Sequence, residues 1–324
     1  MHKSPLTSNK PTRKRAARQH TSNATYIRIM NSTTQLPTQQ KFDYSLFIVS
    51  TGRSGTTMLA KALSGHPQLV MRSEFPYETR TSQHLFNWAA NGRNKKLPYI
   101  ADDGHTKYRL HQKDDRPSEQ WFSDNITLVH KNRAIDIADN YYKFVAELEN
   151  KNNPTAYVEK AIGANTVNRM HRWGWPLKRI LLIRDPRDIL LSVNSFNEKN
   201  NTKGFGADRH SERELLNLYI NFFLNNRKVD SANTPPGIEI KYEALKNDPE
   251  KELTNITAAL GLDSTNKSIT QMLDTYNFVD QDIKQHRTQT NINNVVRWPS
   301  EATDNQLDMF HEFDEKLQLL DYAS

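Results

Sequence analysis

Short apolar runs and helix-like segments alternate along most of the chain. The strand-type runs are residues 44–50, 69–71, 155–160, 179–183 and 238–242. The segments with helical spacing of apolar residues are 56–64, 134–149, 165–171, 186–193, 211–223, 250–260 and 303–320. A continuous apolar run such as 179–183 is typical of a parallel strand that is covered on both faces. Strands that alternate with helices predict an α/β fold with a doubly wound parallel sheet.

Several of these helices carry signals for their ends. Asp185 suits an N-cap, and Pro186 suits the first helical position. Ser211 and Glu214 have the spacing of a capping box, which marks a further helix start. Gly65 stands directly after the first helical segment, where a C-cap glycine is expected.

The stretch at residues 47–57, Phe-Ile-Val-Ser-Thr-Gly-Arg-Ser-Gly-Thr-Thr, joins the first strand to the first helix. Such a strand, tight loop and helix direct several backbone N–H groups at an anion. Gly52 and Gly55 let the backbone turn sharply and approach a ligand. The side chains that add donors are those of Arg53, Ser54, Thr56 and Thr57. An ordinary strand–turn–helix corner is the alternative interpretation.

The loop is not a Walker A motif, because that motif requires G-x-x-x-x-G-K-[ST]. Thr56 stands where the lysine would be, and Ser50 stands where the first glycine would be. The Gly-Arg-Ser-Gly-Thr-Thr sequence instead resembles the 5′-phosphosulfate-binding loop of sulfotransferases, whose donor is 3′-phosphoadenosine 5′-phosphosulfate (PAPS). It is similar to the loop of the tyrosylprotein, carbohydrate and bacterial branches. The cytosolic small-molecule branch has a lysine in place of Arg53. The resemblance implies a P-loop-like fold.

A second motif follows the strand at 179–183. Arg184 stands at the carboxyl end of that strand, where ligands of open α/β sheets bind, and Ser192 lies two helical turns further on. A guanidinium and a hydroxyl so placed can hold one phosphate. A capped helix with a surface arginine is the alternative. The run from Leu182 to Ser192 resembles the 3′-phosphate-binding motif of the same family, with the interval from Arg184 to Ser192 intact.

Two later segments extend the resemblance over about residues 44–320. Tyr242, in the sequence Ile-Lys-Tyr-Glu-Ala-Leu-Lys-Asn-Asp-Pro, is similar to a tyrosine that lies against the adenosine in relatives. The sequence Val-Val-Arg-Trp around Arg297 looks like the late basic segment that closes over the nucleotide. The resemblance therefore implies that Tyr242 and Arg297 bind the nucleotide.

Sulfuryl transfer to a hydroxyl needs a base for the acceptor, in-line placement and neutralisation of charge on the leaving oxygen. Arg53 and the N–H groups of its loop suit the last task. Lys160 matches a lysine that relatives place near the sulfate. The resemblance implies PAPS as the co-substrate. Because a phosphosulfate carries fewer charges than a triphosphate and the sequence shows no constellation of metal ligands, we expect no metal ion.

The base differs from that of the cytosolic branch. Those relatives carry a histidine two residues after the strand-end lysine, whereas here Ile162 follows Lys160 at that interval. In tyrosylprotein relatives a glutamate follows the loop arginine at an interval of 21 residues, and Glu74 stands at that interval from Arg53. We therefore predict Glu74 as the base, with Glu78 as the second candidate. A solvated surface carboxylate is the alternative.

Basic residues are concentrated before the first acidic residue, Asp43. The chain of 324 residues has 44 Lys and Arg, and eight of them precede Asp43. Residues 1–40 are rich in Ser, Thr, Asn and Gln, a composition that predicts a disordered basic tail. The basic cluster at 13–15 could touch nucleic acid or an anionic membrane, but we favour a solubilising tail and expect no nucleic-acid partner. Residues 41–324 form the predicted sulfotransferase domain.

Residues 77–130 form a long polar stretch inside this domain, which we interpret as an acceptor-binding insertion with short helices. Basic and aromatic residues are mixed in it, among them Phe86 and Trp88, which suits a carbohydrate or another polar acceptor. Its histidines lack metal-binding spacing and are interpreted as surface residues. They are His84, His105, His111 and His130.

The predicted function is that of a soluble, cytoplasmic PAPS-dependent sulfotransferase with a hydroxyl acceptor. No apolar run approaches the ~20 residues of a membrane span, and the amino terminus lacks the apolar core of a secretory signal. The absence of cysteine excludes disulfides and thiolate metal sites. Two alternatives stay open. One is a P-loop nucleotide kinase or NTPase that binds ATP with magnesium, and the other is a non-catalytic nucleotide-binding or nucleic-acid-binding protein.

Overall fold

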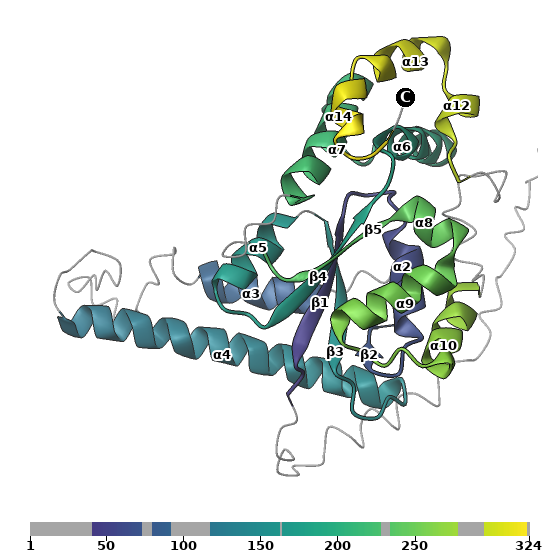
Figure 1. The fold of residues 1–324 in the computed structure, drawn as a ribbon. Coiled ribbons are helices and arrows are strands. Elements are labelled where there is room, and N and C mark those ends of the chain that lie inside the picture. The colour runs from purple at the N-terminus through teal and green to yellow at the C-terminus, as the bar shows by residue number, and fades with distance from the viewer. Residues whose placement is uncertain are drawn as a thin grey trace, which may run out of the picture. The chain divides into compact units, whose positions relative to one another are not determined.

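The structure is a computed structural model that describes residues 41–72, 80–91, 117–162, 164–227, 234–277 and 295–322 (Figure 1). The side chains of residues 91, 117–127 and 162 are outside this description. The chain divides into the units Met1–Lys41 and Phe42–Ser324, and the elements below all belong to the second unit.

The described part of the second unit contains one sheet of five parallel strands, in the order β2-β3-β1-β4-β5. The strands are β1 (Tyr44–Ser50), β2 (Leu69–Val70), β3 (Ala156–Ile162), β4 (Leu177–Ile183) and β5 (Gly237–Lys241). The central strand β1 pairs with β3 on one side and with β4 on the other. The chain therefore leaves β1 first toward one edge of the sheet and later toward the other, which makes the carboxyl end of β1 a switch point for ligand binding.

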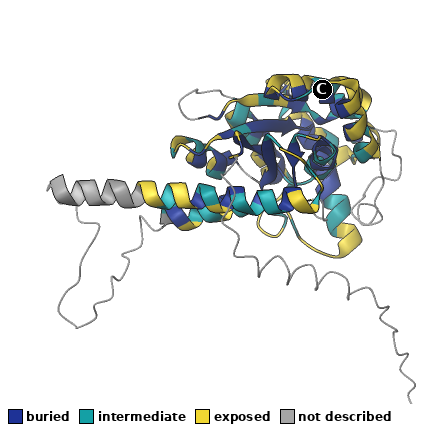
Figure 2. Cartoon of the chain, turned by 90° about the horizontal axis from the view of Figure 1, so that it is seen from below, coloured by how far each residue is buried: buried dark blue, intermediate teal, exposed yellow. Residues whose placement is uncertain are grey.

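Helices cover both faces of this sheet. They are α2 (Thr56–Ser64), α3 (Thr81–Asn91), α4 (Pro117–Leu148), α5 (Ala164–Arg172), α6 (Pro186–Asn200), α7 (Glu212–Arg227), α8 (Tyr242–Asn247), α9 (Pro249–Leu260), α10 (Asn266–Asn277), α12 (Trp298–Glu301), α13 (Asp304–His311) and α14 (Asp314–Gln318). In β1, Leu46 and Ile48 pack with α2, α8, α9 and α10, whereas Phe47 and Val49 pack with α3 to α7. This period of two buries the strands between two apolar layers (Figure 2). The predicted doubly wound parallel sheet is confirmed.

The predicted helix ends are also found. Asp185 caps α6 by accepting a hydrogen bond from the N–H of Arg187 at 2.9 Å. Before α7, the N–H of Ser211 donates to Glu214 Oε2 at 2.8 Å, as a capping box requires. Gly65 closes α2 with an ordinary right-handed φ of −72°. Position 65 requires glycine because α10 packs closely against it: a Cβ there would lie 2.5 Å from the carbonyl oxygen of Gln271.

Three elements differ from the sequence-based expectation. The helix expected over residues 134–149 begins at Pro117 as α4, and the single helix expected over 303–320 is divided into α13 and α14. Tyr242 was expected to end a strand, but it is the first residue of α8. Amphipathic periodicity alone predicts these boundaries poorly. The first half of α4 is rich in polar residues, and the break between α13 and α14 and the start of α8 depend on packing rather than on the pattern of apolar residues.

The described parts of the expected insertion at 77–130 are α3 and the first half of α4. Phe86 of α3 belongs to the core and is 2% exposed, so it cannot line an acceptor site as the sequence suggested. Trp88 is 59% exposed and stacks on His130, with ring centroids 5.9 Å apart. His84 is exposed, as expected, while His105 and His111 lie outside the described residues. None of the described helices is long and apolar enough to span a membrane.

Candidate functional site

The loop between β1 and α2 turns sharply at the switch point of the sheet. Arg53 and Gly55 both have positive φ, 65° and 90° respectively. A Cβ at Gly55 would lie 2.5 Å from the ring of Tyr242, so the loop and that ring are in close contact. Ser54 is fully buried, and its hydroxyl bonds to the carbonyl and hydroxyl oxygens of Thr51 at 3.0 and 2.7 Å. The Ser54 side chain therefore stabilises the loop from inside.

Two arginines from different parts of the chain meet at this loop. Arg184, directly after β4, donates from Nη1 to the carbonyl oxygen of Arg53 at 3.0 Å. Arg53 donates from Nε to the hydroxyl of Ser192 on α6 at 3.2 Å. The guanidinium of Arg184 also lies over the Tyr242 ring, 4.4 Å from its centroid. The structure thus brings together the two motifs and the tyrosine that the sequence analysis named separately.

Arg297 adds a third positive charge to this cluster. Burial, followed by the charges of Arg184 and Arg297, lowers the pKa of Arg53 to about 10. Arg184 and Arg297 are only 4% and 2% exposed. Three like charges held together in a buried place repel one another, so an anion bound there would relieve the repulsion.

Within the described part of the chain, several guanidinium nitrogens of this cluster have no hydrogen-bond acceptor. Nε and Nη2 of Arg184 and Nη1 of Arg297 are shielded from solvent and find no acceptor among the residues that the structure describes. A buried donor without a partner costs about 1–3 kcal/mol, and more when it is charged. Phosphate oxygens are the acceptors that fit a guanidinium fork best. The orphaned donors therefore fit a bound phosphate group.

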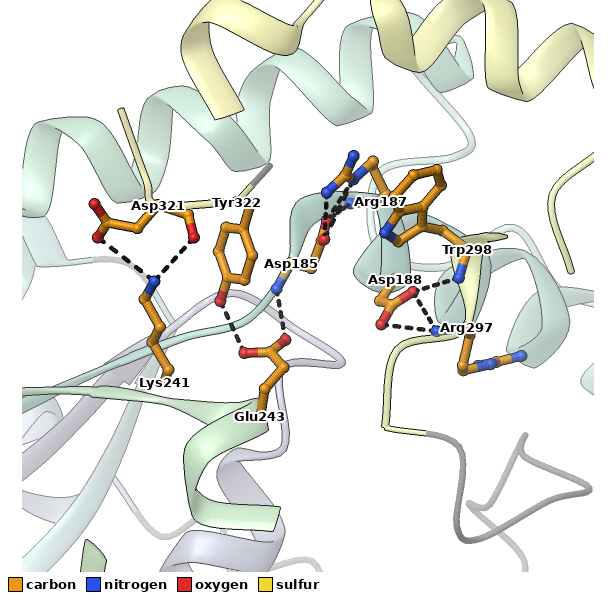
Figure 3. Close-up of polar contacts among 9 residues, drawn as sticks. All are labelled: Asp185, Arg187, Asp188, Lys241, Glu243, Arg297, Trp298, Asp321 and Tyr322. Atoms are coloured by element: carbon orange, nitrogen blue, oxygen red, sulfur yellow. Dashed lines mark hydrogen bonds and ion pairs between the residues drawn. The ribbon is translucent and has the colours of Figure 1, made fainter. Parts of the chain in front are cut away.

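A carboxylate on α6 holds the backbone of Arg297 in place. Asp188, in the first turn of α6, accepts hydrogen bonds from the backbone N–H groups of Arg297 and Trp298 at 3.0 and 2.9 Å (Figure 3). The Arg297 side chain pairs with Glu301, four residues further on. Asp188 and Arg297 are 109 positions apart, so no local pattern could have joined them.

Glu243 is a second carboxylate that sequence reasoning missed. It accepts hydrogen bonds from the N–H of Asp185 at 3.0 Å and from the hydroxyl of Tyr322 at 2.9 Å (Figure 3). Burial raises the pKa of Glu243 above its ordinary value. Glu243 follows Tyr242 and Asp185 follows Arg184 in the chain. The hydrogen bond between Glu243 and Asp185 therefore holds together the two backbone segments that carry the stacked pair of Tyr242 and Arg184.

Lys160 reaches the first turn of α2 from the neighbouring strand β3. Its Nζ donates to the hydroxyl of Thr57 at 3.0 Å. The preceding residue, Glu159, is fully buried and accepts hydrogen bonds from the N–H of Ser82 at 2.7 Å and the hydroxyl of Tyr142 at 2.8 Å. These bonds tie α3 and α4 to the strand that carries Lys160.

Two phenylalanines border the loop on its other side. Phe196 lies under the guanidinium of Arg53, at 4.9 Å from the ring centroid, and packs edge-on against Phe205 at 5.4 Å. A Cβ at Gly52 would lie 2.5 Å from the Phe205 ring. The loop is therefore enclosed by Tyr242 on one side and by Phe205 on the other.

Comparison with known proteins identifies the family. The model of the sulfotransferase family matches residues 45–266, a span that contains the loop, Lys160, Arg184, Ser192 and Tyr242. The chain belongs to the sulfotransferase family. None of the curated proteins compared with the chain matches it.

Solved structures resemble this sulfotransferase at low sequence identity. The sulfotransferase domain of the Synechococcus PCC 7002 olefin synthase is 19% identical, with 90% of this chain and 98% of that chain covered and a TM-score of 0.45. Mouse sulfotransferase SULT7A1, complexed with PAP, is 16% identical, with 86% and 85% covered and a TM-score of 0.45. A sulfotransferase from Alicyclobacillus acidocaldarius is 14% identical, with 87% and 96% covered and a TM-score of 0.38.

Most of the residues expected in the site of this sulfotransferase lie around one loop. They are Arg53, Ser54, Gly55, Thr56, Thr57, Lys160, Arg184, Ser192, Tyr242 and Arg297. The expected base Glu74 and the second candidate Glu78 fall within residues 73–79, outside the described residues. In the part of the chain that the structure describes, no group of three or more His, Asp or Glu residues is arranged to hold a metal ion.

Proposed function

We propose that this sulfotransferase takes the sulfuryl group from PAPS and transfers it to a hydroxyl acceptor. The observation that carries the proposal is a pair of buried Arg184 nitrogens that have no acceptor among the described residues, in a cluster with Arg53 and Arg297. A nucleotide with phosphate groups at both the 3′ and the 5′ position would supply acceptors to such a cluster.

The arrangement of the cluster supports a division of tasks. Arg184 and Arg297 carry the orphaned donors and would hold the 3′-phosphate together with the hydroxyl of Ser192. Arg53 and the amino end of α2 would hold the 5′-phosphosulfate, because the first N–H groups of a helix attract anions. Tyr242, whose ring already lies against Arg184, would line the adenosine.

The reaction supported by this arrangement is a displacement at sulfur. The acceptor oxygen forms a new bond to sulfur, the bond between sulfur and the bridging oxygen breaks, and 3′-phosphoadenosine 5′-phosphate (PAP) leaves. Arg53 and Lys160 would place positive charge at the leaving side, where negative charge develops. Lys160 is held for this task by the hydroxyl of Thr57.

The acceptor loses a proton during the transfer, and a base must take it. Glu74 is the base that we propose, with Glu78 as the second candidate, on the interval from Arg53 and on the replacement of the usual histidine by Ile162. Carbohydrates and other polar metabolites are the acceptor class that we propose. The support is the mixture of basic and aromatic residues over 77–130. Phe86 is excluded from this set because it is buried in the core.

A thermal shift measurement with the full chain tests the donor assignment. With EDTA present, PAP at one hundred times its dissociation constant should stabilise the protein by about 2.7 kcal/mol through mass action. ATP at the same concentration should give a clearly smaller shift. If EDTA abolishes the effect of PAP, or if ATP stabilises the protein equally well, the assignment of PAPS as the donor is wrong.

A further inference from the structure

We infer that Asp188 is a positioning residue of the donor site, which holds Arg297 toward the bound nucleotide without touching the nucleotide itself. The inference rests on the proposed function, in which Arg297 contacts the 3′-phosphate. It assigns a task to a carboxylate that lies beside Arg184 and the backbone of Arg297, where a negative charge would otherwise oppose the binding of an anion.

The geometry places Asp188 between the segment with Arg184 and Ser192 and the segment that carries Arg297. It lies on α6, four residues after Arg184 and four residues before Ser192. Its Oδ1 accepts from the N–H groups of Arg297 and Trp298 at 3.0 and 2.9 Å, and its Oδ2 lies 3.2 Å from the N–H of Arg297 (Figure 3). The side chain is fully buried. One carboxylate thus binds two successive backbone donors of the segment that carries Arg297.

Other contacts of Arg297 fix its orientation less well. The ion pair with Glu301 joins the N-cap residue of α12 to the last residue of the same short helix, so it moves together with Arg297. The contact from Nη2 to the hydroxyl of Ser195 on α6 is long, at 3.4 Å. The ring of Trp298 packs on the guanidinium of Arg187 at 3.9 Å, which holds the neighbouring residue. The strong polar attachment between α6 and the Arg297 backbone is therefore the carboxylate of Asp188.

The electrostatic cost of Asp188 points the same way. Burial raises its pKa from 3.8 to about 6, although Arg184 and the two N–H groups favour the charged form. The charged and titratable groups around it are Arg184 and Asp185 before α6, Arg297, and Tyr242 of α8. Because the pKa is raised in the folded protein, the stability that this group contributes is lost as the pH rises through about 6. An ionised Asp188 therefore lowers stability at neutral pH while it organises the site.

A double-mutant cycle on PAP affinity tests the inference. The full chain and the variants Asp188→Asn, Arg297→Ala and the double variant are titrated with PAP by calorimetry at pH 7.5 and constant salt. An amide keeps the shape but offers a single weaker acceptor, so Asp188→Asn should weaken PAP binding by about tenfold. In the Arg297→Ala background the same change should have no further effect, because Asp188 acts through Arg297. Additive losses, or tighter binding by Asp188→Asn, would overturn the inference.

Stability and a matched control separate positioning from a purely structural role. Asp263 also accepts a backbone hydrogen bond, from Thr265 at 3.1 Å, and its hydrogen bonds lower its pKa. Asp263→Asn should therefore lower the melting temperature and leave PAP affinity unchanged. Asp188→Asn should weaken PAP binding, and its melting temperature at pH 7.5 should be no lower than that of the unchanged chain. If Asp188→Asn lowers the melting temperature as Asp263→Asn does, Asp188 is a structural residue.

The pH profile gives the last readout. As the pH falls from 7.5 to 5, Asp188 gains a proton, so the tenfold difference in PAP affinity between the unchanged chain and Asp188→Asn should shrink toward none. The titration of PAP itself cancels in this ratio. A ratio that stays constant overturns the inference. If the unchanged chain binds no PAP, the proposed function fails; if it binds PAP but the cycle is additive, only the inference about Asp188 fails.

Discussion

Replacing Gly55 by alanine should damage both the stability of the fold and the donor site. Gly55 has φ of 90°, a conformation that costs an alanine roughly 1–2 kcal/mol. The added Cβ would also lie 2.5 and 2.6 Å from two carbons of the Tyr242 ring, which is 7% exposed. Overpacking of a buried site costs about 1–3 kcal/mol. We therefore expect Gly55→Ala to lower the free energy of unfolding by about 2–5 kcal/mol.

Gly261 provides a matched control for the backbone part of this loss. It caps α9 with φ of 72°, and a Cβ there would have no atom within 4 Å. Gly261→Ala should therefore cost about 1–2 kcal/mol, from backbone strain alone. Both variants introduce backbone strain, but only Gly55→Ala also introduces the clash with Tyr242. The difference between their free energies of unfolding, measured in urea, therefore gives the cost of the clash.

The same pair of variants tests whether Tyr242 belongs to the donor site. The displaced ring lies 4.4 Å from the guanidinium of Arg184, so Gly55→Ala should weaken PAP binding at least tenfold, whereas Gly261→Ala should leave it unchanged. Equal losses of stability in the two variants, with equal PAP affinity, would refute the close contact between the loop and Tyr242.

Three further predictions concern other parts of the chain. Glu74→Gln should lower kcat by ~10²–10⁴ with PAP affinity nearly constant, and wild-type turnover across the pH range would show Glu74 to be a surface carboxylate. Lys151→Met should lower the free energy of unfolding by about 2–3 kcal/mol, because Lys151 Nζ donates to three carbonyl oxygens at 2.5–2.6 Å; unchanged urea unfolding would contradict this. Removal of residues 1–40 should leave the melting temperature and PAP affinity unchanged, and a lower melting temperature would show that the segment packs on the domain.

The sequence predicted the sheet and the loop well because their signals are local. The apolar run of β1 and the glycine and hydroxyl pattern after it lie within residues 44–57, and the observed β1 and α2 match the expected bounds. Arg184 and Ser192 were also found, because Arg184 stands directly after β4 and Ser192 follows eight residues later on α6, an interval that the sequence shows directly.

The parts that could not be predicted depend on contacts between distant segments. Asp188 reaches Arg297 across 109 positions, and Glu243 reaches Tyr322 across 79. Each carboxylate looks like an ordinary helix-end residue in the sequence, since its partners are backbone N–H groups or a tyrosine that no pattern marks. Phe86 was misjudged for the same reason, because burial of an aromatic residue depends on the helices packed around it.

Calorimetric titration with PAP and with AMP, which lacks the 3′-phosphate, tests the central claim most directly. Both ligands are titrated in EDTA into the unchanged chain, into Arg184→Ala and into Arg209→Ala, a control in which a largely exposed arginine is removed. The unchanged chain and Arg209→Ala should prefer PAP by about 10- to 100-fold, as a charge-assisted contact worth about 1.5–3 kcal/mol requires, and Arg184→Ala should lose that preference. Equal affinity of the unchanged chain for the two nucleotides, or a preference that survives Arg184→Ala, would contradict the assignment of this cluster to the 3′-phosphate.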